Sequence, residues 1–360
     1  MTVETRRWQP EWSVPPGEIL AEALEERAMS QAELARRLDR PIKTVNEIIR
    51  GKASITADTA VQLEQVLDVP ARFWLNLQRD HSEAIARRRA DQQRDEHASW
   101  IEAFPIAAMR RQKLLPQTRV KSAVLEALLR FFGVTGPEAW RRQQTAVQAT
   151  FRRSTAFEQN AESVAVWLRL GELKASPIAT RPFNAQALRA LIPQLRSLSR
   201  TDPSVFSVKL VEMLADVGVV IAFVRELPGT RVMGATRWLS PERALLQLSL
   251  RYRRDDQFWF ALFHELGHLL EGSRRRSYIE VEDTADADES AADQFASREL
   301  LPESAYGDFT TAGDFSEHAV REFARNVDVA PGIVVGRLQH DRHVPFARLN
   351  YLKTRIDWSA

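Results

Sequence analysis

One stretch, residues 258–272 with the sequence FWFALFHELGHLLEG, constrains the fold more than any other part of the chain. Its residues are apolar almost all the way round a helix, which predicts a helix buried inside a domain. His264, Glu265 and His268 nevertheless lie in its middle. Burying unpaired imidazoles and a carboxylate costs several kcal/mol, so these groups need a partner that offsets their desolvation. We therefore expect this helix to bind a metal ion.

The spacing of the three polar residues indicates zinc chemistry. His264 and His268 are four residues apart, so both rings lie on one helix face and can bind one ion. Glu265 is rotated by about 100° from His264, so it reaches a water molecule on the ion rather than the ion itself. This is the HExxH pattern of zinc hydrolases, in which the glutamate is the general base. We predict Zn²⁺ as cofactor and Glu265 as the catalytic residue.

A third protein ligand is expected downstream, because catalytic zinc takes three protein ligands and keeps one position open for water. The chain has no cysteine, so this ligand must be a histidine or a carboxylate. The predicted helix 288–301 offers Asp288, Glu289 and Asp293, and Glu289 shares its apolar face with Ala292. We predict Glu289 as the third ligand and Asp293 as the acceptor for a ligand histidine N–H. The alternatives are core histidines beside a solvated acidic helix, or a zinc site without hydrolytic activity.

The residues around this motif resemble a known family. FALFHELGHLL followed by ExxxDxFA is similar to the ImmA/IrrE zinc metallopeptidases, and the similarity covers about residues 191–348. The resemblance implies His264 and His268 as ligands, Glu265 as base and Glu289 as third ligand, an HExxH gluzincin arrangement. Family members cleave repressors of the helix-turn-helix class, which implies a protein substrate: a partner repressor, a toxin or the chain itself.

One position departs from that family. Glu271 stands where many members carry histidine. Because this position is outside the metal ligand set, the expected chemistry is unchanged.

The first 90 residues predict a bundle of short helices. Ser30 and Glu33 form a capping box at the start of the second helix, and Gly51 ends the third. The expected helices are 17–27, 30–38, 41–50, 56–67 and 70–89. Short helices with a tight turn between the second and third are typical of the helix-turn-helix. The segments PGEIL, MSQAELARRL and RPIKTVNEIIRGKASIT resemble the XRE-type, HigA-like antitoxin domain, which implies binding to double-stranded DNA.

The third helix is the expected recognition helix. Its apolar residues, predicted to be buried, are Ile42, Val45, Ile48 and Ile49. Short polar side chains near the start of such a helix read base edges, whereas flanking cations contact phosphates. The predicted DNA-binding residues are Gln31, Lys43, Thr44, Asn46, Arg50 and Lys52. A homodimer is expected by analogy with two-half-site binding. The alternative is a bundle that serves only dimerisation or toxin binding.

The rest of the chain predicts a multidomain fold. Residues 91–119 are polar, rich in arginine and glutamine and punctuated by prolines, which favours a linker or irregular connection. The segments 219–224, 232–239 and 244–250 are short and β-branched or alternating, so we expect strands. We predict an all-α helix-turn-helix domain at 1–90, a linker and helical middle at 91–190, and an α+β zincin-like domain with a small sheet at 191–360. A substrate peptide is expected to pair with the edge at 232–239 or with a neighbouring edge.

No apolar run approaches the roughly 20 residues needed to cross a bilayer, and the opening segment lacks a signal-peptide core. We therefore expect a cytoplasmic protein with no membrane partner. The sequence predicts a DNA-binding, antitoxin-like transcriptional regulator with a zinc endopeptidase domain. The alternative is a repressor whose zincin-like domain senses a ligand or metal without proteolysis.

Overall fold

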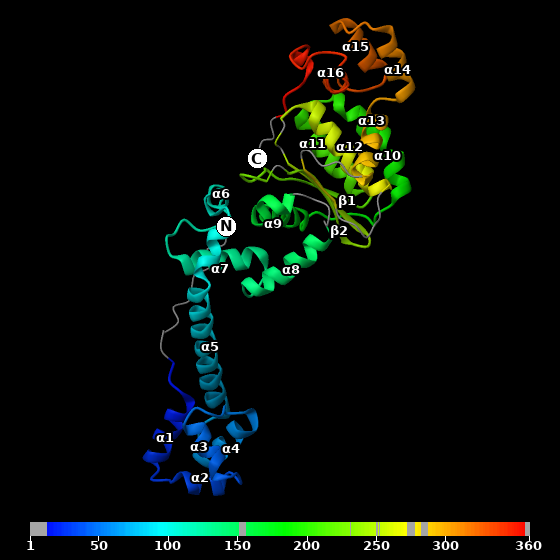
Figure 1. Cartoon of the computed structure of the whole chain (residues 1–360). Helices are drawn as coiled ribbons and strands as arrows, with labels where there is room; N and C mark the ends of the chain where they lie inside the picture. Colours follow the sequence, from blue (N-terminus) through cyan, green and yellow to red (C-terminus); the bar gives the residue numbers. More distant parts are fainter. Residues whose placement is uncertain are drawn as a thin grey trace. The chain divides into compact units, whose positions relative to one another are not determined.

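The computed structural model describes residues 13–150, 156–230, 232–249, 251, 253–271, 278–281 and 287–356. Contacts within the chain define two compact units. The first is Met1–Ser99 with Val120–Glu126, and the second is Trp100–Arg119 with Ala127–Ala360. The three-part division at 90 and 190 stays a prediction. Figure 1 shows α1 to α4 of the first unit in blue, and the mixed helices and strands of the second unit in cyan to red.

The first unit begins with the predicted helical bundle. Its helices are α1 (Pro16–Glu26), α2 (Gln31–Arg37), α3 (Ile42–Ile49), α4 (Ala57–Leu67) and α5 (Ala71–Glu96). The Ser30 hydroxyl accepts a hydrogen bond from the Glu33 amide at 3.1 Å, as the capping box predicts. Thr56 caps α4 in the same way, accepting from the Thr59 amide at 3.3 Å. These caps satisfy helix-terminal amides that would otherwise lack a partner.

The bundle encloses a small apolar core that includes Leu34, Leu63 and Trp74. Burial of each such side chain contributes roughly 1.5–3 kcal/mol. A side chain at Gly17 would overlap the backbone carbonyl of Ile48, so glycine permits the close approach of α1 to α3. The prediction that Ile42 is buried is wrong. Ile42 is 49% exposed because it begins α3, before the helix turns its apolar face to the core.

The linker predicted from residue 91 is wrong at its start, because α5 continues to Glu96. A short 3-10 helix, η1 (Ala98–Ala103), and α6 (Ile106–Arg111) follow. The end of α5 is polar all round, and a helix of this kind is supported by pairs of opposite charge three or four residues apart. Arg87 lies 2.6 Å from Glu83, and Arg94 pairs with Asp91. The polar composition therefore encodes an exposed helix there.

The middle of the chain is helical. It contains α7 (Lys121–Phe132), α8 (Pro137–Thr150), α9 (Ala156–Ala175), α10 (Ala185–Ser197) and α11 (Pro203–Ala215). The aromatic rings of Trp100, Phe104, Phe132 and Trp140 form a cluster with centroids 4.7–5.7 Å apart. Such ring pairs add stability beyond their buried area.

A four-stranded mixed sheet forms the centre of the second unit. Its strands are β1 (Val219–Phe223), β2 (Val232–Ser240), β3 (Arg243–Leu248) and β4 (Tyr278–Val281). The order is β1-β3-β2-β4, with β1 parallel to β3 and the other pairs antiparallel. The three predicted strand segments correspond to β1, β2 and β3. The expected free edge at 232–239 is not free over 232–236, because β4 pairs there, from Val232 with Val281 to Thr236 with Tyr278.

Helices cover both faces of this sheet. Alternate β3 residues Ala244, Leu246 and Leu248 share a core with α12 (Asp255–Glu271). The intervening Gln247 faces the other way and donates a hydrogen bond to the Trp167 carbonyl of α9 at 2.7 Å. Because strand side chains alternate between faces, α12 and α9 lie on opposite sides of the sheet. Figure 1 shows the same layering.

The C-terminal helices pack beside α12. They are α13 (Ala287–Leu300), α14 (Glu303–Ala312), α15 (Glu317–Asn326) and α16 (Pro331–His340), followed by the 3-10 helix η3 (Asn350–Leu352). Three α-helices therefore follow α13 among the described residues. In the part of the chain that the structure describes, no helix is long and apolar enough to span a bilayer.

Candidate metal centre and nucleic-acid interface

The close approach of α12 to α13 positions the candidate metal centre. A side chain at Gly267 would lie 3.2 Å from the Ala292 Cα atom and the Phe295 side chain. Glycine at this point lets the two helices come close together. Glu289, on the first turns of α13, is thereby brought to the histidines of α12.

The three predicted ligand atoms converge. The Nε2 atom of His264 lies 2.9 Å from Glu289 Oε2 and 3.0 Å from His268 Nε2. His268 Nε2 lies 3.5 Å from Glu289 Oε2. Both histidines are buried and Glu289 is half-buried. His264, His268 and Glu289 therefore direct three donor atoms at one point.

The donor set fits a zinc ion. Ligand atoms at 2.0–2.1 Å from a tetrahedral zinc lie roughly 3.3 Å from one another, and the observed separations bracket this value. Asp293 Oδ1 lies 2.8 Å from His264 Nδ1, on the opposite side of the ring from Nε2. A hydrogen bond from Nδ1 to this carboxylate leaves the Nε2 lone pair for a metal, the role predicted for Asp293. The chemistry of the set is that of a His₂Glu zinc site.

Glu289 is ionised at neutral pH. Burial by itself raises its pKa, but hydrogen bonds and charge interactions with His264 and His268 outweigh burial and lower the pKa to about 2. A carboxylate that binds a metal must be deprotonated, so this environment favours binding.

Strand β2 lies against the predicted base, Glu265. This side chain is 0% exposed, and its Oε2 atom accepts a hydrogen bond from the Thr236 hydroxyl at 2.5 Å. A side chain at Gly234 would overlap Glu265 Oε1, so only glycine leaves room for the carboxylate. Gly234 and Thr236 were not predicted from the sequence. A glycine inside a predicted strand was the available signal, since it often marks such a close approach.

A second unpredicted contact comes from β4. The Tyr278 ring stacks on the His268 ring, with centroids 4.0 Å apart and an angle of 6° between the planes. This contact fixes the orientation of the His268 imidazole. No motif marked Tyr278, because the contact depends on how β4 pairs with β2. The side chain of Asp288, the other candidate considered on α13, lies outside the described residues.

The predicted DNA-contacting residues lie on or beside α2 and α3. Gln31 is the exposed first residue of α2, and Arg50 and Lys52 are exposed just after α3. The Lys43 side chain is 83% exposed and lies 3.8 Å from Glu47. Thr44 and Asn46 are half-buried. Val45 and Ile48 are buried beneath them, so α3 presents a polar face from a fixed position.

The turn between these helices has a defined conformation. Asp39 has a left-handed backbone with φ of 50°, and the Arg40 side chain donates to Gln62 of α4 at 2.7 Å. These features tie α2 and α3 to the rest of the bundle. The arrangement is a rigid pair of helices with a polar second helix.

Residues 20–74 match the helix-turn-helix family model. A curated Escherichia coli K12 protein, described as the uncharacterized HTH-type transcriptional regulator YddM, is 36% identical over 76 residues, which are 21% of this chain and 81% of the relative. This chain belongs to the helix-turn-helix family. Virulence-associated protein I of Dichelobacter nodosus is 40% identical over 67 residues, covering 18% of this chain and 62% of that protein.

Solved structures with similarity to this chain include HigA antitoxins. An addiction module antidote protein of the HigA family from Coxiella burnetii is 38% identical with a TM-score of 0.22, covering 23% of this chain and 91% of that one. Pseudomonas aeruginosa antitoxin HigA, solved with the higBA promoter, is 42% identical with a TM-score of 0.22, covering 23% and 90%.

Proposed function

We propose that the N-terminal unit binds operator DNA and that the protein is an antitoxin-like transcriptional regulator. The family match over residues 20–74 and the transcriptional regulator named among its relatives support this role. The polar face of α3 supplies side chains for base edges, and Arg50 and Lys52 supply charge for phosphates. We infer a homodimer on two half-sites, which light scattering of the full-length protein tests.

The same proposal assigns a zinc-dependent endopeptidase of the ImmA/IrrE type, with a zincin-like fold, to the C-terminal region. One observation carries it: His264, His268 and Glu289 direct three ligand atoms at one point, next to the Glu265 that completes HExxH. A structural zinc site has no need of a buried carboxylate beside its ligands. A hydrolase needs such a group as general base.

A zinc ion, when bound, supplies Lewis-acid activation of water and of a peptide carbonyl. In the proposed reaction Glu265 accepts a proton from the attacking water and passes it to the nitrogen of the leaving amine. The Thr236 hydroxyl donates a hydrogen bond that holds the Glu265 carboxylate in place for both proton transfers, and the missing side chain at Gly234 leaves room for it. The substrate is a regulatory protein: a repressor, a toxin or another copy of this chain.

The position of β4 changes where we expect the substrate backbone. Among the described strands, β4 is the edge strand next to β2, and its Tyr278 stacks on a ligand histidine. An extended peptide that paired with the outer edge of β4 would lie beside the metal centre. We therefore assign the peptide to β4 rather than to residues 232–239.

The decisive test compares the wild type with Glu265→Gln in the zinc-loaded, full-length protein. A proteome-derived peptide library, read by mass spectrometry of new N-termini, reports cleavage, and gel shift reports operator binding. We expect cleavage to fall roughly 10²–10⁴-fold with zinc content and operator binding unchanged. Glu271→Gln, on the same helix but paired with Arg298 at the surface, is the matched control and should cleave normally.

A different outcome would support the alternative function. If the wild type binds zinc but cleaves nothing, and zinc removal changes only operator affinity, the C-terminal region is a sensor and the peptidase assignment is wrong.

A further inference from the structure

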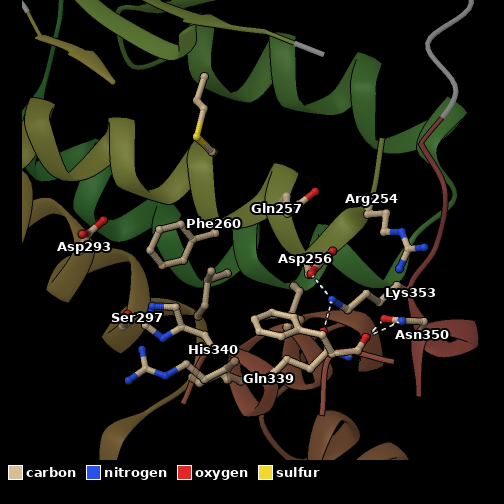
Figure 2. A pocket seen from close by; sticks show the side chains of 17 residues that line it. Arg254, Asp256, Gln257, Phe260, Asp293, Ser297, Gln339, His340, Asn350 and Lys353 are labelled. Atoms are coloured by element: carbon tan, nitrogen blue, oxygen red, sulfur yellow. Dashed lines mark hydrogen bonds and ion pairs between the residues drawn. The ribbon is translucent and has the colours of Figure 1, made fainter. Parts of the chain in front are cut away.

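A cavity of about 650 Å³ lies beside the candidate metal centre (Figure 2). Its walls come from α12, α13, α16, the segment after α16, and Met233 of β2. Most of its surface is apolar, supplied by Phe260, Leu300, Leu301, Ile333 and Phe346. None of the three metal ligands lines it. Cavities of this size with mostly apolar walls and a few polar groups are typical of small-molecule sites.

A buried lysine defines the polar end of the cavity. Lys353 is 7% exposed, and its ammonium lies 2.5 Å from Asp256 Oδ2 and 2.7 Å from Gln339 Oε1. Figure 2 shows these contacts, with Asn350 and Arg254 nearby. An ammonium group has three N–H donors, and these two acceptors are the partners found among the described residues. The lysine can therefore donate one more hydrogen bond to a bound molecule.

The charges around the cavity are balanced within the protein. Lys353 neutralises Asp256, and Arg337 lies 2.7 Å from Asp341. Of the remaining charged side chains on the walls, Arg254 is exposed and Asp293 contacts His264. An ionised ligand would lose its hydration on entering the cavity, which is costly. It would find no buried opposite charge that is not already paired within the protein. The walls therefore favour an uncharged molecule that carries a hydrogen-bond acceptor.

The cavity shares residues with the surroundings of the metal centre. Asp293 lines the cavity, and its Oδ1 atom lies 2.8 Å from His264 Nδ1. Phe260, also on the wall, has its ring centroid 6.4 Å from that of His264. A molecule that moved either side chain would change the orientation or basicity of a metal ligand.

The cavity lies on the Nδ1 side of the His264 ring, which indicates that it is not the pocket for the substrate peptide. His264 Nδ1 contacts Asp293, whereas Nε2 faces Glu289 and His268. These nitrogens point to different sides of one ring. A scissile peptide bond would lie on the Nε2 side, so the cavity lies behind the ligand rather than in front of it.

We propose that this cavity binds an uncharged, mostly apolar small molecule with a hydrogen-bond acceptor, and that Asp293 transmits its occupancy to His264. The apolar part lies against Phe260, Leu300 and Ile333, and the acceptor takes the third N–H of Lys353. The binding step does not depend on peptidase activity, and the coupling requires only that the metal binds. Binding of the small molecule thereby changes the affinity of the proposed centre for its metal.

The test uses the zinc-loaded, full-length protein and the neutral dye N-phenyl-1-naphthylamine, whose fluorescence rises in apolar sites. We expect saturable binding, displaced by 2-undecanone at least tenfold better than by decanoate, which is charged, or by undecane, which lacks an acceptor. Ser297→Phe and Gln257→Phe fill the cavity from α13 and α12 and should each weaken binding at least tenfold. Ser304→Phe, at an exposed position on α14, is the matched control and should bind normally.

Coupling is read from zinc affinity, measured by chelator competition with and without saturating 2-undecanone. We expect at least a threefold change in the wild type, and none in Ser297→Phe or Asp293→Asn. Absence of saturable dye binding, or equal binding by both filled variants and the control, overturns the site. Binding with unchanged zinc affinity overturns the coupling. Displacement of the dye by substrate peptides better than by 2-undecanone would make the cavity a substrate pocket and overturn the proposal, whatever the outcome for Glu265→Gln.

Discussion

The proposed recognition helix α3 and the proposed metal-binding helix α12 place polar residues in opposite environments. On α3 the residues proposed to contact DNA lie at the surface or half-buried, and they come from one short segment with its flanks. On α12 His264, Glu265 and His268 are buried, and their partners come from α13, β2 and β4. A surface site needs only a rigid support, whereas a buried polar site needs partners from several elements to offset desolvation.

This difference has an energetic consequence. An exposed side chain on α3 can change with little effect on folding, because it leaves water only when DNA binds. A substitution at the metal centre leaves a buried neighbour without its partner, which costs about 1–3 kcal/mol or more. Substitutions on the α3 surface should therefore change DNA binding without changing folding stability. Substitutions at the candidate metal centre should change both metal binding and folding stability.

Removal of a metal ligand should give the largest effect. Glu289→Ala deletes the oxygen donor, so zinc affinity should fall by more than about 100-fold, beyond the loss typical of residues that only support a ligand. Zinc content by mass spectrometry after chelator competition measures this. Gln294→Ala, at an exposed position on α13, is the control. Operator binding should stay unchanged, and an equal fall in operator affinity would mean that the two regions do not act separately.

The next largest effect is a pH dependence of folding stability that comes from Asp255, a buried residue at the start of α12. Burial, with a smaller contribution from the charge of Asp256, raises the pKa of Asp255 to about 6, against a hydrogen bond from the Thr354 backbone. An unfolded Asp has a pKa near 3.8, so the folded chain binds this proton more tightly and its stability falls as pH rises from about 4 to about 6. Asp255→Asn removes this dependence.

The stability of Asp255→Asn relative to the wild type should therefore rise by roughly 3 kcal/mol between pH 4 and pH 7. Urea unfolding of the metal-free, full-length protein at several pH values measures this difference. Asp308→Asn, at an exposed position, is the matched control. A constant difference across this range would contradict the assignment.

The smallest effect is expected on the DNA-binding surface. Arg50→Ala removes one cation proposed to contact a phosphate, so the slope of log affinity against log salt concentration should decrease by about 1. Affinity at fixed salt should fall equally for different operator sequences. Arg72→Ala, exposed on α5, should leave the slope unchanged if it lies outside the interface. A change in sequence preference would instead assign Arg50 to base contacts.

Local sequence patterns predicted helices and strands better than they predicted which residues those elements bury or which elements they pack against. The capping box at Ser30 and the strand segments near β1, β2 and β3 depend on nearby residues, and the structure has them. The linker at residue 91 was wrong because composition alone does not distinguish an exposed charged helix from a loop. Burial of Ile42 was wrong because an apolar residue at a helix start can lie outside the core.

At the candidate metal centre the three residues could be selected from the sequence because helical periodicity places His264 and His268 on one face and Glu289 on the apolar side of its own helix. The convergence of their donor atoms within 4.8 Å is a property of how α12 packs on α13. Gly234, Thr236 and Tyr278 were not predictable in the same way. Each contacts an α12 residue only because of the sheet order β1-β3-β2-β4.

The sequence by itself determined the short helices of the N-terminal bundle and that His264, Glu265 and His268 share one buried helix. Tertiary structure alone decided that β4 covers part of the β2 edge, that β2 holds Glu265, and that a cavity lies behind His264. The physical reason is the distance along the sequence over which each interaction acts. Helix periodicity and capping act over three or four residues, whereas desolvation of a buried polar group is offset by whichever distant element the packing brings to it.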